Sequence, residues 1–121
     1  MNWQFDNNMP IYTQLVSQIK FGIVSGELPP GERLSTVRDL AAEAGVNPNT
    51  MQRAFQELER EGLVYSQRSN GRFVTEDVSI IDNAKMALAK QHIDVFMAAM
   101  KQLGYETDEI ITLLSGSRTE D

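Results

Sequence analysis

Two amphipathic segments separated by a two-residue break, within residues 36–58, constrain the fold more than any other part of the sequence. In the first segment, apolar residues recur at i, i+3, i+4 and i+7, and Thr36 stands three residues before Asp39, a variant of the helix capping box. Gly45 can end this helix, since glycine is common just past a helix C-terminus. The pattern predicts a short helix from Thr36 to Gly45 whose buried side carries Val37, Leu40, Ala41 and Ala44.

The second segment opens with residues that favour the start of a helix. Asn47 can cap it, and Pro48 suits the first turn, where a missing N–H costs nothing. A helical stripe of Met51, Ala54, Phe55 and Leu58 then predicts that Asn49, Gln52, Arg53 and Gln56 point away from the core. Two helices joined by a tight glycine turn are typical of a helix-turn-helix, whose second helix enters the major groove of DNA.

The polar side chains at the start of this second helix suit contacts with DNA. Amides such as those of Asn47, Asn49 and Gln52 can bind adenine edges, and Arg53 can bind guanine. The helix N-terminus and the Thr50 hydroxyl can bind phosphate. Asparagine and proline are also ordinary helix openers, so this stretch alone leaves a purely structural role open.

Two further elements are predicted around this pair of helices. Before it, Pro10 can begin a helix that extends to about Ser25, with apolar residues at helical spacing until Gly26, and the prolines of GELPPGERL predict a rigid loop. After it, residues 63–65 and 73–74 have the composition of strands.

A hairpin is predicted between these strands. Asn70-Gly71 is a strong signal for a hairpin turn, and a hairpin directly after the second helix is a wing. Its tip places Arg68 and Arg72 where they can contact the DNA backbone or the minor groove.

The charges are unevenly distributed along a chain whose formal net charge is -6. Residues 26–75 carry six arginines against seven acidic residues, whereas residues 76–121 carry four basic and nine acidic residues. All cations of the first region are arginines, which suit bidentate contact with phosphate or guanine. Chance could also produce this pattern.

Several classes of protein are excluded by what the sequence lacks. It has no cysteine and one histidine, His92, so neither a disulfide framework nor a metal site is expected. Neither a glycine-rich phosphate loop nor a nucleophile motif is present, and Glu57, Glu59 and Glu61 suit a solvated helix face, so we expect no enzyme activity and no cofactor. The sequence shows no membrane span and no signal peptide, which predicts a cytoplasmic protein.

The motifs SGELPPGERL, VRDLA, GVNPNT, RAFQELEREGLV and GRFV, in this order and spacing, resemble the GntR family of bacterial winged-helix transcription regulators over about residues 10–74. The resemblance implies that Arg38, Asn49, Thr50, Gln52, Arg53 and the wing around Arg68 lie where this family contacts operator DNA. Double-stranded DNA is therefore the expected partner.

The C-terminal region is too short for the ligand-binding domains of larger GntR subfamilies. It predicts a helix over residues 79–103, a break at Gly104 and a short helix capped by Thr107 that ends near Gly116. An apolar stripe that two helices cannot bury alone predicts a homodimer. The stripe comprises Ile81, Ala84, Leu88, Phe96, Met100 and Leu103.

This layout resembles the YtrA-like subfamily, whose short helical tail serves dimerisation and whose members often regulate transporter or cell-envelope operons. Three methionines in the tail, with Phe96 and Tyr105, leave a small hydrophobic pocket for an unidentified effector open as an alternative. The methionines are Met86, Met97 and Met100.

The sequence therefore predicts a mainly α fold with a small β-hairpin wing. A winged helix-turn-helix DNA-binding domain is expected over residues 1–78, and a two-helix dimerisation tail, which could also hold an effector, over residues 79–121. The predicted function is that of a homodimeric repressor of a transporter or cell-envelope operon that binds a palindromic operator. The alternative is a winged helix used for protein contacts without sequence-specific DNA binding.

Overall fold

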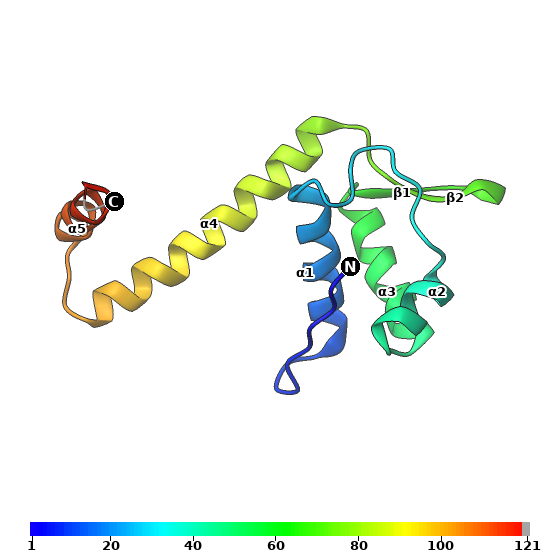
Figure 1. Ribbon diagram of the computed structural model, residues 1–121, viewed down its shortest axis with the longest axis horizontal. Helices are drawn as coiled ribbons and strands as arrows, with labels where there is room; N and C mark the ends of the chain where they lie inside the picture. Colours follow the sequence, from blue (N-terminus) through cyan, green and yellow to red (C-terminus); the bar gives the residue numbers. More distant parts are fainter. Residues whose placement is uncertain (120–121) are drawn as a thin grey trace. The chain divides into compact units, whose positions relative to one another are not determined.

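The structure is a computed structural model that describes residues 1–119, in which five α-helices and a two-stranded antiparallel sheet form (Figure 1). The elements are α1 (Ile11–Val24), α2 (Val37–Ala44), α3 (Pro48–Arg60), β1 (Val64–Gln67), the 3-10 turn η1 (Arg68–Asn70), β2 (Gly71–Val74), α4 (Val78–Gln102) and α5 (Thr107–Thr119). The predicted fold class is confirmed. The last two residues of the predicted tail lie outside the described residues.

The chain divides into two compact units, Met1–Lys85 and Met86–Asp121. The division falls within α4, later in the chain than the predicted domain boundary after residue 78. Ile81 explains the difference, because its side chain is only 7% exposed and belongs to the core of the first unit. The first turn of α4 therefore completes the fold of the first unit.

The predicted ends of α2 and α3 are confirmed in detail. The Thr36 hydroxyl oxygen accepts a hydrogen bond from the Asp39 amide at 3.1 Å, and Gly45 ends α2 with a left-handed φ of 72°. The Asn47 side-chain oxygen accepts from the Asn49 amide at 2.7 Å, and Pro48 is the first residue of α3. These local interactions fix the turn between the two helices.

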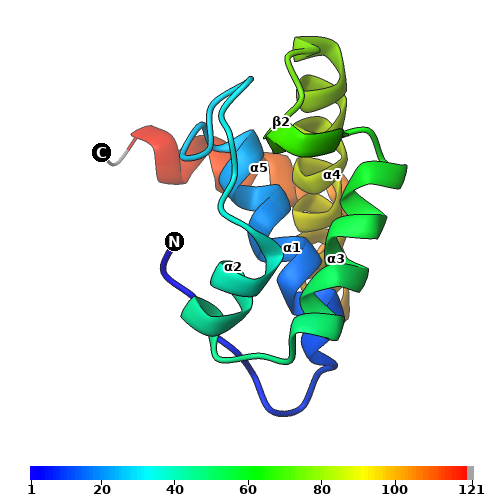
Figure 2. The ribbon, with the colours of Figure 1, turned by 90° about the vertical axis from the view of Figure 1, so that its right-hand side faces the viewer.

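Helix α3 is central to the first unit, since it contacts α1, α2 and β1. Figure 2 shows α1, α2 and α3 grouped together in this unit. The predicted stripe of α3 is buried, and it joins apolar side chains from α1, α2 and the hairpin in one cluster. Its best-buried members are Leu15, Ile19, Ile23, Met51, Phe55, Leu58, Leu63 and Val74.

The wing forms as predicted, with Val64 opposite Val74 and the Tyr65 ring stacked on Phe73. The turn differs from expectation, because the chain passes through η1 and only Gly71 takes a positive φ there, at 95°. Asn70-Gly71 is therefore not the two central residues of a tight hairpin turn.

The loop before α2 also pairs with the sheet, which the residue pattern of the loop does not indicate. Arg33 forms an isolated antiparallel bridge with Phe73. The Leu34 amide donates to the Arg72 carbonyl at 2.8 Å, and the Val74 amide donates to the Glu32 carbonyl at 2.9 Å. The end of the predicted rigid loop is thus held along β2.

The second unit contains the rest of α4 and the helix α5. The break at Gly104 is confirmed, with a φ of 98°. At the start of α5, the Glu106 amide donates to the Glu109 carboxylate at 2.9 Å, so Thr107 lies inside the helix instead of capping it. The predicted end near Gly116 is wrong, since α5 continues to Thr119. No helix within residues 1–119 is long and apolar enough to cross a membrane.

Candidate nucleic-acid interface

The first turns of α3 present an uncharged polar surface with a single cation. Asn47 and Asn49 are exposed, Thr50 and Gln52 are half-buried, and Arg53 is exposed. Asn49, Gln52 and Arg53 lie off the buried stripe of α3, as predicted. The amide N–H groups and the positive end of the helix dipole lie at the same end, so this surface attracts anions such as phosphate.

The acidic residues of α3, Glu57 and Glu59, lie in its second half, and the C-cap residue Glu61 follows them. Arg60 donates two hydrogen bonds to Glu57, which lower the pKa of that carboxyl to about 2. Lys20 contacts the Glu61 carboxylate at 2.7 Å, and Arg72 of the wing pairs with Glu59. Local pairing therefore reduces the repulsion that these acids would exert on DNA phosphates.

Several arginines of the first unit keep their charge unpaired. Arg33, Arg38 and Arg68 are exposed, and none of the three has an ion pair with a residue that the structure describes. Arg38 lies in the first turn of α2, and Arg68 lies in η1 at the tip of the wing. The free cations thus come from α2, the wing and the loop before α2, although the whole chain is acidic.

Arg53 is held by an aromatic ring from another helix. Its guanidinium carbon lies 4.3 Å from the centroid of the Tyr12 ring, at the start of α1. Such a cation–π contact restricts the side chain without neutralising its charge, so the guanidinium donors are available to a nucleic acid. Tyr12 therefore positions a cation on the exposed face of α3.

Arg72 is positioned differently from the other predicted contact residues. Its Nε donates to the Glu59 carboxylate at 2.6 Å, and its guanidinium lies 5.5 Å from the Phe55 ring centroid. Ser66, from β1, donates to the same carboxylate at 2.8 Å. These contacts tie both strands of the wing to α3, and a contact of Arg72 with DNA stays a prediction.

We expect the Arg72–Glu59 pair to be coupled by about 1 kcal/mol in a double-mutant cycle of Arg72→Met and Glu59→Gln, measured by urea unfolding. The expected coupling energy is modest because both side chains are partly exposed to water, Arg72 at 24% and Glu59 at 31%. A coupling indistinguishable from zero would show that the pair does not stabilise the wing.

The same pair is expected to make stability depend on pH. Burial raises the pKa of Glu59, but hydrogen bonds from Arg72 and Ser66 outweigh it, and the net pKa is lowered. A lowered pKa means that the stabilisation is complete above the pKa of the unfolded state and is lost as the pH falls through that of the folded state. The Glu59→Gln variant should therefore lose less stability on acidification than the wild type does.

Arg33 is a further candidate contact residue; in the sequence it is one of the six arginines of residues 26–75, but it was not predicted as an individual DNA contact. Its guanidinium lies beside Gly71, where a Cβ on the glycine would be 3.4 Å from Arg33 Nε. A surface hollow of about 140 Å³ is lined by the loop, the start of α2 and the start of β2, through Arg33, Thr36 and Gly71 among others. Its signal in the sequence was an arginine three residues before the Thr36 cap.

The residues predicted to mediate dimerisation fall into two groups. Ile81 is buried in the first unit and Ala84 packs against its core, so both side chains are used within one protomer. The remaining four belong to the second unit and keep exposed surface: Leu88, Phe96 and Met100 on α4, and Leu103 in the turn that follows it. Leu103 has 73% of its surface exposed.

The arrangement is similar to that of known bacterial regulators. Residues 11–74 match the family described as bacterial regulatory proteins, gntR family. The chain is 40% identical over 111 residues to the HTH-type transcriptional regulator YhcF of Bacillus subtilis (strain 168), covering 92% of each chain. It is 36% identical over 97 residues to the HTH-type transcriptional repressor YtrA of the same organism, covering 80% of this chain and 70% of YtrA.

A solved structure extends the similarity to nearly the whole chain. A GntR family transcriptional regulator from Listeria monocytogenes superposes with a TM-score of 0.85 and 38% identity, covering 93% of this chain and 98% of that one. The likeness thus includes the helical tail as well as the winged helix.

Proposed function

The chain belongs to the gntR family of bacterial regulatory proteins and is a DNA-binding transcriptional regulator, not an enzyme; from this premise we propose that it is a homodimeric repressor that binds a palindromic operator. The observation that carries the proposal is the charge pattern of the first unit. The acids of α3 are paired, the start of α3 is free of acids, and Arg38, Arg53 and Arg68 keep their charge. Such a surface suits the phosphates and base edges of a major groove.

Exposed apolar surface on the second unit supports dimerisation. Large apolar side chains remain exposed on α4, on α5 and in the turn between them, and the cost of leaving them in water falls when a second copy covers them. They include Met86, Ile93, Val95, Phe96, Leu103, Ile111, Leu113 and Leu114. A two-fold dimer would present two α3 helices to a two-fold symmetric operator.

The sign of regulation is supported by a relative, since YtrA is named as a repressor. A transporter or cell-envelope operon as the target is proposed from the resemblance to the YtrA-like subfamily alone. In the proposed mechanism, the bound dimer occupies a promoter of the bacterial chromosome in the cytoplasm and blocks transcription. We assign DNA binding to the domain predicted over residues 1–78 and dimerisation to the tail predicted over residues 79–121, apart from Ile81 and Ala84, which pack in the first unit.

Selection of bound duplexes from a random DNA library, at near-physiological salt, tests the proposal directly. We expect enrichment of a motif with two-fold symmetry whose half-sites are about one helical turn apart. An enriched motif without symmetry would contradict the dimeric mode. Equal, salt-sensitive binding to every duplex would contradict sequence-specific binding and favour the protein-contact alternative.

Arg38→Ala is expected to weaken binding to the selected operator by about 1 to 3 kcal/mol without unfolding the protein, because Arg38 is exposed and its side chain has no ion pair within the described residues. Titration at fixed salt measures the loss. Arg60→Ala is the matched control, since Arg60 is also exposed but is paired with Glu57 at the far end of α3. Equal losses in the two variants would remove Arg38 from the contact surface.

A further inference from the structure

A cavity of about 130 Å³ lies in the first unit where three helices meet the N-terminal segment. Its walls include Ile19 from α1, Leu40 from α2 and Phe55 from α3, all of them core residues. Trp3 and Met1 line it from the N-terminal segment. The cavity therefore touches each helix of the DNA-binding unit, and no residue of the tail contributes to it.

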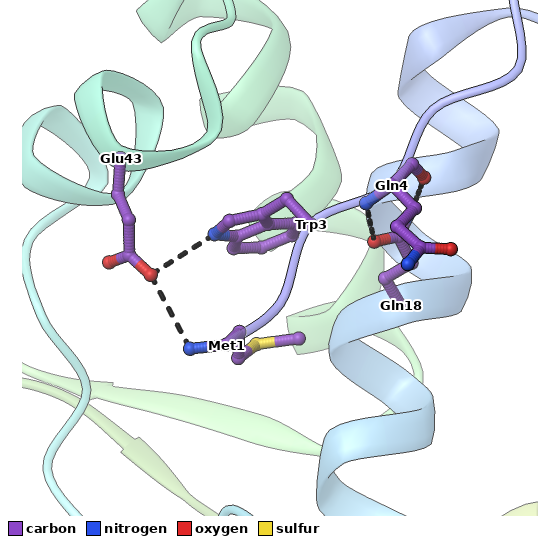
Figure 3. Close-up of polar contacts among 5 residues, drawn as sticks. All are labelled: Met1, Trp3, Gln4, Gln18 and Glu43. Carbon is purple, nitrogen blue, oxygen red and sulfur yellow. Dashed lines mark hydrogen bonds and ion pairs between the residues drawn. The ribbon is translucent and has the colours of Figure 1, made fainter.

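The N-terminal segment is fixed over the helices by polar contacts, which Figure 3 shows. Trp3 Nε1 donates to the Glu43 carboxylate of α2 at 3.2 Å, and the Met1 ammonium group contacts the same oxygen at 3.4 Å. The Gln4 amide donates to the Gln18 side chain of α1, which donates back to the Gln4 carbonyl. These contacts hold the Trp3 indole in place at the wall of the cavity.

The chemistry of the walls selects the kind of ligand. The buried part of the wall is aliphatic or aromatic, whereas the charged and polar lining residues are exposed, so the cavity opens to solvent on their side; these are Glu32, Arg33, Ser35 and Glu43. Small-molecule sites commonly combine an apolar and aromatic wall with a few polar groups at the opening. We propose that this cavity is a binding site for a compact, uncharged aromatic molecule of the size of benzene or phenol, with Trp3 and Phe55 as its aromatic contacts.

Titration of the wild-type protein with benzene and with phenol tests the site. Trp3 is the only tryptophan of the chain, so its fluorescence reports directly on the cavity wall. We expect a saturable change in its emission and a rise in Tm that follows the same binding curve, because a ligand that binds only the folded state stabilises it. Absence of a saturable change for both probes would overturn the proposal, as would equal binding of the much bulkier 1-adamantanol.

Filling the cavity locates the binding. Leu34 lines the cavity and is half-buried, and Leu34→Phe is expected to abolish the saturable response. Leu103→Phe is the matched control, since Leu103 is exposed and belongs to the second unit, and it should bind like the wild type. If circular dichroism shows that Leu34→Phe does not fold, Leu28→Phe fills the cavity from another wall. An unchanged response in the folded filled variant would overturn the assignment.

These measurements contain no DNA. A failure of the ligand site is therefore distinguishable from a failure of the proposed function.

Discussion

The double variant Phe96→Asp and Leu103→Asp is expected to be monomeric and to bind the operator roughly 100- to 10,000-fold more weakly than the wild type. Phe96 is exposed on α4 and Leu103 is exposed directly after its end, and a carboxylate at each position would have to be buried in the proposed interface without a partner. A monomer contacts one half-site only, so it loses the effective concentration that the second α3 helix gains once the first has bound.

Light scattering and operator titration measure the two parts of this expectation. The wild type should have twice the chain mass of 13.6 kDa, and the double variant the mass of one chain. Gln91→Asp with Gln102→Asp adds the same charge on exposed polar positions of α4 that lie on the side opposite Phe96 at helical spacing, and it should remain dimeric. A dimeric Phe96→Asp, Leu103→Asp variant would exclude this stripe as the interface.

Phe55→Ala is expected to lower the free energy of unfolding by about 3 to 5 kcal/mol, the largest stability effect that we predict for a single change. Phe55 is 1% exposed and is part of the central stripe of α3, and its ring also supports the Arg72 guanidinium that ties the wing to this helix. Removing the ring leaves a cavity beside the one already present under Trp3.

Urea unfolding at one fixed protein concentration measures the loss, because the stability of a dimer depends on concentration. Phe21→Ala is the matched control, since the Phe21 ring is 63% exposed, and its effect should stay within about 0.5 kcal/mol. If Phe55→Ala leaves no folded baseline, Phe55→Leu should give a smaller loss that can be measured. A loss for Phe55 no greater than that for Phe21 would contradict the central place of α3 in the core.

The pair of helices, the wing and the fold class could be predicted because their signals are local. Thr36 with Asp39, and Asn47 with Asn49, form their hydrogen bonds within a single turn of chain, and apolar spacing fixes which side of each helix is buried. The outward position of Asn49, Gln52 and Arg53 on α3 follows from the same spacing.

Contacts between residues far apart in sequence were not predictable in this way. Arg72 was predicted to contact DNA because it is an arginine near the tip of the wing, but in the fold its side chain contacts Glu59 and Phe55 of α3. Ile81 lies at helical spacing from the other residues of the predicted dimerisation stripe, but its position at the start of α4 brings it into the core of the first unit. In each case the residue type suits two roles, and the packing of a distant element decides between them.

The sequence was sufficient to predict the caps of α2 and α3 and the winged helix-turn-helix, since these depend on backbone preferences and hydrophobic period over a few residues, whereas the ends of α5 were predicted wrongly. Only the tertiary structure decided which cations remain free, since pairing of Glu57, Glu59 and Glu61 depends on side chains from the same helix, the wing and α1. It alone placed Trp3 and Met1 at a cavity with residues of all three helices. Ion pairs and cavities arise from distances between elements, and a linear pattern of residue types does not contain those distances.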